Sequence, residues 1–154
     1  MSSEGFELPL RLLLAFRMMI DELHAELARQ GHPDGRPMYG FVMQAIIRGG
    51  DTAVELGRML GVSKQAAGKT IETLERVGYV ERTTDPRDTR RKIVRLTPYG
   101  MDALTRSARI FDTLRARWAE ELGEERLQAL ESDLRRMTPA NLWRLDIPGW
   151  FGTL

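Results

Sequence analysis

The chain has 154 residues, which is enough for one sizeable hydrophobic core and too few for two separate domains. Apolar residues make up 42% of it and charged residues 29%, a balance typical of globular proteins and not of disordered ones. The absence of cysteine excludes disulfides, thiolate zinc sites and thiol-based redox sensors; with only His24 and His32 as imidazole ligands, no metal and no other cofactor is expected.

Positive charge is concentrated in one stretch of the chain. Residues 63–95 carry nine basic and five acidic side chains, a net charge of +4, whereas the whole chain carries only +1. The remainder is therefore mildly acidic. One basic region on such a body is typical of a protein that places one face against a polyanion.

The first predicted element is a helix over residues 8–30. Its apolar side chains recur every three or four residues, at Leu12, Phe16, Met19, Leu23 and Leu27. Gly31 and Pro33 are expected to end it. The apolar stretch at its start is short and is interrupted by Arg11 and Arg17, so neither a signal peptide nor a membrane span is indicated, and a cytoplasmic location is expected.

Two shorter helices are predicted to follow. The first covers residues 38–48 and stops at a pair of glycines. The second covers residues 53–60, where Thr52 and Glu55 fit a capping box in which each side chain bonds the other residue's backbone N–H. A left-handed Gly61 is expected to end this helix sharply.

A helix over about residues 64–77, capped by Ser63, completes a helix-turn-helix. Its period places three apolar side chains on one face: Ala67, Ile71 and Leu74. The second helix of such a motif lies in the major groove of DNA and needs polar donors near its start. The residues that meet this need are Ser63, Lys64, Gln65 and Lys69.

Two strands, residues 79–84 and 91–96, are predicted to form a β-hairpin around a turn at 85–90. Asp85 and Asp88 are expected to brace this turn, either by capping backbone amides or by pairing with an arginine.

Three arginines lie at or beside the predicted hairpin tip: Arg87, Arg90 and Arg91. A narrow minor groove concentrates negative potential and favours inserted arginine, so this hairpin is interpreted as a DNA-binding wing. The competing interpretation is a solvated charge run, which the preceding helix-turn-helix disfavours.

Two helices complete the predicted fold, the first opened by Thr97 and Pro98 and broken at Gly123. The fold class is therefore mainly α with a small β-hairpin, in a single domain spanning residues 1–154. A winged helix-turn-helix lobe occupies 38–96, helices at 8–30 and 98–138 form a dimerisation region, and 139–154 is a C-terminal tail whose aromatic residues either extend the interface or form a poorly ordered end.

The outer helices carry more apolar surface than a winged-helix core of this size needs. They either cover one enlarged monomer core or, as we favour, form a homodimer interface, because two recognition helices held roughly 34–36 Å apart read successive major grooves. The expected interface residues are Leu12, Phe16, Phe111, Leu114, Trp118, Leu130 and Leu134.

Over residues 8–138 the chain resembles the MarR family of bacterial and archaeal regulators. The resemblance rests on four segments in this order and spacing: residues 56–65, 74–80, 85–91 and 96–100. It implies an obligate homodimer that binds a palindromic promoter site in double-stranded DNA, usually as a transcriptional repressor, and that a small, often aromatic ligand releases. Ser63, Gln65, Ala66 and Lys69 match the family's recognition helix, and Arg90 matches its minor-groove arginine.

Three positions depart from the family pattern: Gly57, Gly68 and Thr89. Thr89 stands where a second wing arginine is common, so minor-groove affinity is expected to be lower. The glycines are expected to loosen the recognition helix and its partner, and Gly68 either lets the backbone approach DNA or lies beneath a neighbouring helix.

The resemblance places a ligand pocket near Met18, Met38, Tyr39 and Met43, with Met19 and Phe41 close by, although residues of this kind more often form a plain core. No catalytic triad, phosphate-binding loop or metal cluster is present in the sequence, so enzyme activity is not expected. The alternative function is an architectural or protein-interaction module that binds DNA without sequence choice or not at all.

Overall fold

The computed structural model of the chain describes residues 4–140, so most of the predicted tail lies outside the described residues. The elements in chain order are α1 (Glu4–Arg29), α2 (Pro37–Ile47), α3 (Ala53–Leu60), α4 (Lys64–Val77), β1 (Val80–Asp85), β2 (Asp88–Leu96), α5 (Pro98–Leu122) and α6 (Glu124–Met137). The predicted fold class, helical with one small hairpin, is confirmed. None of these helices is long and apolar enough to cross a membrane.

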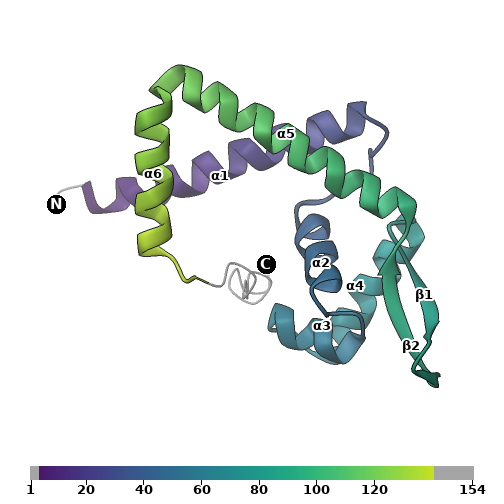
Figure 1. Ribbon diagram of the computed structural model, residues 1–154. Coiled ribbons are helices and arrows are strands. Elements are labelled where there is room, and N and C mark those ends of the chain that lie inside the picture. Colours follow the sequence, from purple (N-terminus) through teal and green to yellow (C-terminus); the bar gives the residue numbers. More distant parts are fainter. Residues whose placement is uncertain (1–3, 141–154) are drawn as a thin grey trace.

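Figure 1 shows two parts, which we call the winged lobe and the helical arm. The winged lobe contains α2, α3, α4 and the β1–β2 hairpin. The helical arm contains α1, α5 and α6, with α5 leading from the hairpin to α6.

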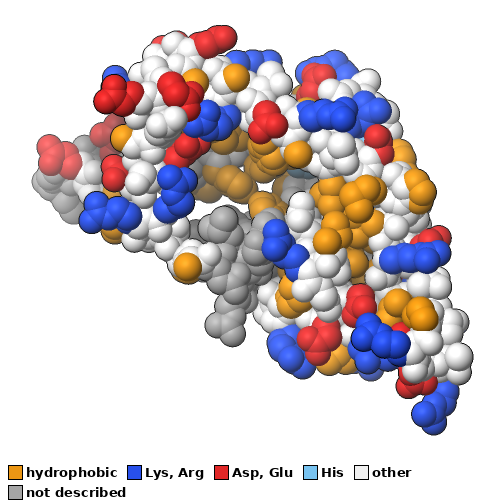
Figure 2. Space-filling model, viewed as in Figure 1, with side chains coloured by type: hydrophobic (Ala, Val, Ile, Leu, Met, Phe, Trp, Pro, Cys, Tyr) orange, Lys and Arg blue, Asp and Glu red, His pale blue; other side chains and the backbone are white. Residues whose placement is uncertain are grey.

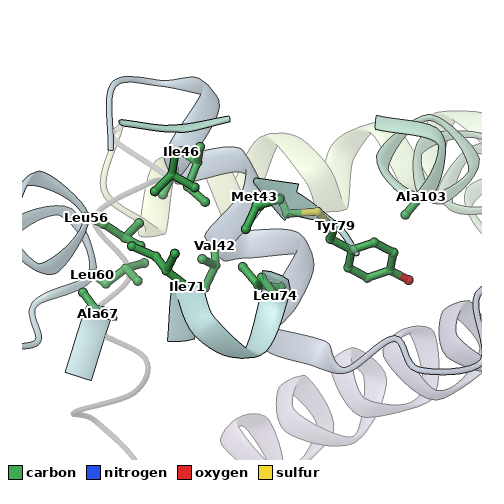
Figure 3. Packing of buried hydrophobic residues seen from close by; sticks show 13 residues of the cluster. Val42, Met43, Ile46, Leu56, Leu60, Ala67, Ile71, Leu74, Tyr79 and Ala103 are labelled. Atoms are coloured by element: carbon green, nitrogen blue, oxygen red, sulfur yellow. The ribbon is translucent and has the colours of Figure 1, made fainter. Parts of the chain in front are cut away.

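The core of the winged lobe lies between its three helices and the base of the hairpin (Figure 3). The predicted inner face of α4 is confirmed, because Ala67, Ile71 and Leu74 are at most 1% exposed. Leu56 of α3 and Val42 of α2 are equally well buried against them. This core fixes which face of α4 remains in solvent.

The hairpin is longer and its turn tighter than predicted. β1 ends at Asp85 and β2 begins at Asp88, so the predicted turn over residues 85–90 is wrong: Arg90 lies on the strand, as Arg91 was predicted to. The side chains of Asp85 and Asp88 accept hydrogen bonds from backbone N–H groups beside the tip, and these bonds support the tight turn. Composition marks Asp85, Pro86 and Asp88 as turn formers, but it cannot show at which residues the two strands begin to pair.

The first helix also begins earlier than predicted, at Glu4 rather than at residue 8. Glu4 and Glu7 lie in its first turn, where negative side chains stabilise the positive end of the helix dipole. The prediction relied on the spacing of apolar residues and therefore missed this charged first turn.

The helical arm has a small core of its own, formed by Ile20, Leu23, Leu27, Ile110 and Leu114. Leu114 is only 5% exposed there, so its predicted place at a dimer interface is wrong, because α1 of the same chain covers it. Trp118 is half-buried. The other predicted interface residues are exposed: Leu12, Phe16, Phe111, Leu130 and Leu134.

Candidate nucleic-acid interface

The helix-turn-helix is held by three local features that the sequence predicted. Thr52 Oγ1 accepts a 3.2 Å hydrogen bond from the Glu55 backbone N–H, and Ser63 Oγ accepts one of 3.0 Å from Ala66. Gly61 has a φ of 69°, the left-handed conformation that ends α3. The capping box is only half formed, because the Glu55 carboxylate pairs with Arg58 at 2.8 Å.

Gly57 tightens this motif, contrary to the expectation that it would loosen it. A Cβ atom at Gly57 would lie 2.8 Å from the carbonyl oxygen of Val62 in the turn between α3 and α4. The absent side chain therefore lets the turn pack directly on α3. At Gly68, in contrast, a Cβ atom would meet nothing within 4 Å, so the interpretation that Gly68 lies beneath a neighbouring helix is wrong.

The outer face of α4 presents the predicted polar residues to solvent. Ser63, Lys64, Gln65, Ala66 and Lys69 are all exposed. The Ser63 hydroxyl already accepts the cap hydrogen bond, which fixes its position at the start of α4. The long side chains of Lys64, Gln65 and Lys69 are therefore the ones that extend furthest from this face.

The hairpin carries its arginines outward. Arg87 and Arg90 have side chains 89% and 91% exposed, and Arg91 is exposed on β2. Asp85 accepts from the Arg87 backbone N–H at 2.9 Å and Asp88 from that of Arg90 at 3.1 Å, which confirms that the two aspartates brace the tip. Figure 2 shows basic side chains on this projecting hairpin.

A groove of about 450 Å³ lies between the start of α3, α4 and the hairpin, and it contains basic residues that the sequence analysis had not selected. Its lining includes the predicted Lys64 and Arg91 together with Arg82 and Lys92. Arg82 pairs with Glu75 at 2.8 Å, and Lys92 donates to Thr84 at 3.0 Å. Because side chains alternate between the two faces of a strand, the sequence could in principle place Arg82 and Lys92 on this face. That assignment needs the pairing register of the two strands, which only the folded hairpin defines.

A second, mostly apolar cavity of about 270 Å³ lies where the arm meets the lobe. It lies between α1, α2 and α5, and is lined by Ile20, Leu23, Pro37, Gly40, Phe41, Gln44, Leu104, Ser107, Ala108 and Phe111. The predicted ligand residues lie elsewhere. Met43 is buried in the core of the winged lobe, Met18 is exposed on α1, and Met38 and Tyr39 are half-buried on α2 without lining this cavity.

Residues 37–91 match the family model described as the MarR family. No curated protein was found to match the chain. Among solved structures, transcriptional regulator Tm0710 from Thermotoga maritima is 25% identical, with a TM-score of 0.58 and coverage of 87% of this chain and 92% of that one.

Two further solved structures carry bound molecules. A mutant of MarR from E. coli complexed with operator DNA is 23% identical, with a TM-score of 0.65 and coverage of 89% of this chain and 97% of that one. MepR from S. aureus bound to ethidium bromide is 20% identical, with a TM-score of 0.60 and coverage of 84% and 92%. The described chain is similar to each of them across both the winged lobe and the helical arm.

Proposed function

We propose that this chain, which has the fold of MarR-family regulators and matches that family over residues 37–91, is a homodimeric transcriptional repressor that binds a palindromic promoter site. The observation that carries the proposal is the joint placement of α4 and the hairpin. The polar face of α4 and the arginines of the hairpin are all exposed, and a groove with four basic side chains and one acidic one, Glu55, lies between the hairpin and the starts of α3 and α4.

This arrangement suits two grooves of one duplex. Gln65 and Lys69 have the donors and acceptors that read base edges in the major groove, and Arg90 extends from the wing as a minor-groove side chain does. Lys64 and Arg91 lie along the groove between them and have the charge to contact phosphate. One such lobe makes a small footprint, so a dimer that places two lobes on one face of DNA is part of the proposal.

We propose that a small effector binds in the cavity between the helical arm and the winged lobe, and not at the methionines suggested by the sequence. Phe41 and Phe111 offer aromatic surface there, and Gln44 and Ser107 offer polar groups that could orient a small aromatic ligand. The ethidium complex of MepR supports such a ligand class. A ligand that fits better when arm and lobe are rotated apart would shift the dimer to a spacing unsuited to DNA.

The test uses the full chain and fluorescently labelled DNA from upstream of its own gene. We expect the affinity for this DNA to exceed that for a shuffled duplex by at least about 1,000-fold at physiological salt, and to fall as salt rises. Equal affinity for both duplexes would refute the proposal and favour the architectural module. Sedimentation of the same samples measures whether the binding species is a dimer.

A further inference from the structure

His32 is a buried polar side chain that joins three separate parts of the chain. It lies in the loop between α1 and α2 and is only 1% exposed. Its Nε2 is 2.8 Å from Asp102 Oδ2 on α5, and its Nδ1 is 3.1 Å from the hydroxyl of Tyr79. Its ring also stacks on Tyr99, with ring centroids 4.4 Å apart.

These contacts lie at the joint between the helical arm and the winged lobe. Tyr79 comes directly after Gly78, the residue that ends the proposed recognition helix α4. The Tyr79 carbonyl accepts from the Thr97 backbone N–H at 3.0 Å, so the end of α4 is attached to the start of α5. A Cβ atom at Gly100 would lie only 2.1 Å from that carbonyl, which shows how closely the two segments pack.

His32 adds the end of α1 to this joint. Its backbone N–H donates to Leu27 at 2.8 Å, and the Tyr99 hydroxyl donates to the Gly31 carbonyl at 2.7 Å. The backbone of His32 is therefore attached to the end of α1, while its ring contacts Asp102 of α5 and Tyr79 beyond the end of α4.

The hydrogen positions follow from the partners of the ring. Hydrogen bonds from His32 and Arg106 hold the pKa of the Asp102 carboxyl below its usual value, so this group is ionised at neutral pH and only accepts. The His32 Nε2 must therefore carry a hydrogen. Burial raises the pKa of Tyr79 to about 12, so its hydroxyl keeps its proton and donates to the Nδ1 lone pair of a neutral ring. In this state every polar atom of the cluster has a partner.

Protonation of His32 would break this pattern. Nδ1 would then carry a hydrogen and could only donate, so the Tyr79 hydroxyl hydrogen would lose its acceptor; no other partner of that hydroxyl is present in the part of the chain that the structure describes. Asp102 would attract the new charge, but its side chain is 44% exposed, and the same Oδ2 already pairs with Arg106 at 2.7 Å.

The other groups around the cluster do not offset the loss. Tyr99 of α5 stacks on the ring, Tyr39 of α2 meets Tyr79 edge to face, and Gln30, directly after α1, accepts from Arg106. Asp34 in the same loop is close enough to influence Tyr79. Of these groups only Asp34 is an acid, and it acts on Tyr79, not as a hydrogen-bond partner of the ring.

We propose that His32 is a positioning residue: its neutral ring holds the arm against the end of α4, and its protonation loosens this joint and weakens DNA binding. The inference rests on the proposed function and adds a pH response to it. Protein switches that work between pH 5 and 8 commonly use histidine, so the test below covers that range.

The test measures affinity for the upstream DNA at constant ionic strength from pH 8.0 to 5.5. For the unmodified chain we expect a loss of about tenfold, within the usual range for coupling between two sites. His32→Gln should bind at pH 8.0 and lose the pH dependence. Tyr79→Phe should bind more weakly than the unmodified chain at pH 8.0 and show a smaller pH dependence, because the hydrogen bond that protonation breaks is then absent at every pH.

The matched control is His24→Gln, since His24 is the other histidine of the chain and, among residues 4–140, hydrogen-bonds only the Ile20 carbonyl of its own helix. This variant should keep the full pH dependence. A flat profile in the unmodified chain, tighter binding at low pH, or an unchanged slope in His32→Gln would overturn the inference. Failure of the unmodified chain to distinguish its own DNA at pH 8.0 would instead refute the proposed function.

Discussion

The winged lobe and the helical arm differ in how completely each covers its own apolar side chains. The cluster centred on the lobe contains thirteen buried residues, whereas that of the arm contains five. Most of the large exposed apolar residues belong to the arm, including the run on α1 from Phe6 to Met18 and Phe111, Leu130 and Leu134 on α5 and α6. Figure 2 shows apolar surface along the inner side of the open angle between arm and lobe.

An apolar stripe along a helix can therefore have two roles in this protein: it can form the core of its own chain or remain exposed for a partner. The apolar stripe of α4 stabilises the lobe directly, because α2 and α3 cover it. The apolar residues of the first half of α1, with Leu130 and Leu134 of α6, are left exposed by the described part of the chain, and contiguous apolar surface is typical of an interface. The lobe is therefore expected to depend on its internal packing and the arm on a second subunit.

The largest effect should come from a core truncation in the lobe. Leu74→Ala removes a fully buried side chain and should lower the free energy of unfolding by about 2–5 kcal/mol. Leu134→Ala, on the exposed side of α6, should change the stability of a dilute monomer by less than about 0.5 kcal/mol. Chemical denaturation measures both, and equal losses would contradict the contrast between the two regions.

A charge on the open face of the arm should separate the subunits. Phe16→Asp places a carboxylate where a partner would bury an aromatic ring, so sedimentation should show monomers and DNA affinity should fall by at least about 100-fold, or 2.7 kcal/mol. Ile47→Asp is the matched control, because Ile47 is an exposed apolar residue of the lobe. Dimers that persist in Phe16→Asp would show that this face is not the interface.

Removing one wing arginine should weaken DNA binding without affecting the fold. Arg90→Ala is expected to cost about 1–3 kcal/mol of binding free energy, measured by fluorescence anisotropy on the upstream DNA. Arg109→Ala removes an exposed arginine from the arm and should leave affinity nearly unchanged. If the two variants behave alike, the arginines of the wing are a solvated charge run.

The smallest effect is expected at Gly68. A Cβ atom there meets nothing, so Gly68→Ala should raise the free energy of unfolding by about 1 kcal/mol, as for glycine to alanine in a helix interior. Gly57→Ala is the opposite control and should destabilise by roughly 1–3 kcal/mol, because its Cβ atom would collide with the turn. A lower DNA affinity in Gly68→Ala would indicate that the backbone of α4 approaches the duplex there.

Local chemistry explains why the elements of the lobe could be predicted from sequence. The caps at Thr52 and Ser63, the left-handed Gly61 and the apolar period of α4 all act within a few residues, and all four are present in the structure. The bracing of the hairpin by Asp85 and Asp88 was likewise predictable, since each carboxylate bonds a backbone group two residues away.

Other features depend on contacts between distant segments. Periodicity identified Leu114 as apolar, but only the packing of α1 on α5 shows that its own chain buries it. The cavity between arm and lobe and the basic residues Arg82 and Lys92 became visible only once the register and the helix crossing were known.

The sequence by itself determined the order of the helices and strands and which face of α4 stays in water, because caps and side-chain periods within one element set both, whereas the ends of the hairpin strands depended on their pairing. The tertiary structure alone decided which apolar stripes the chain covers for itself and where His32 lies. That histidine looked like an ordinary loop residue. Its role depends on Tyr79 and Asp102, which are 47 and 70 positions away and which only the folded chain brings to its ring.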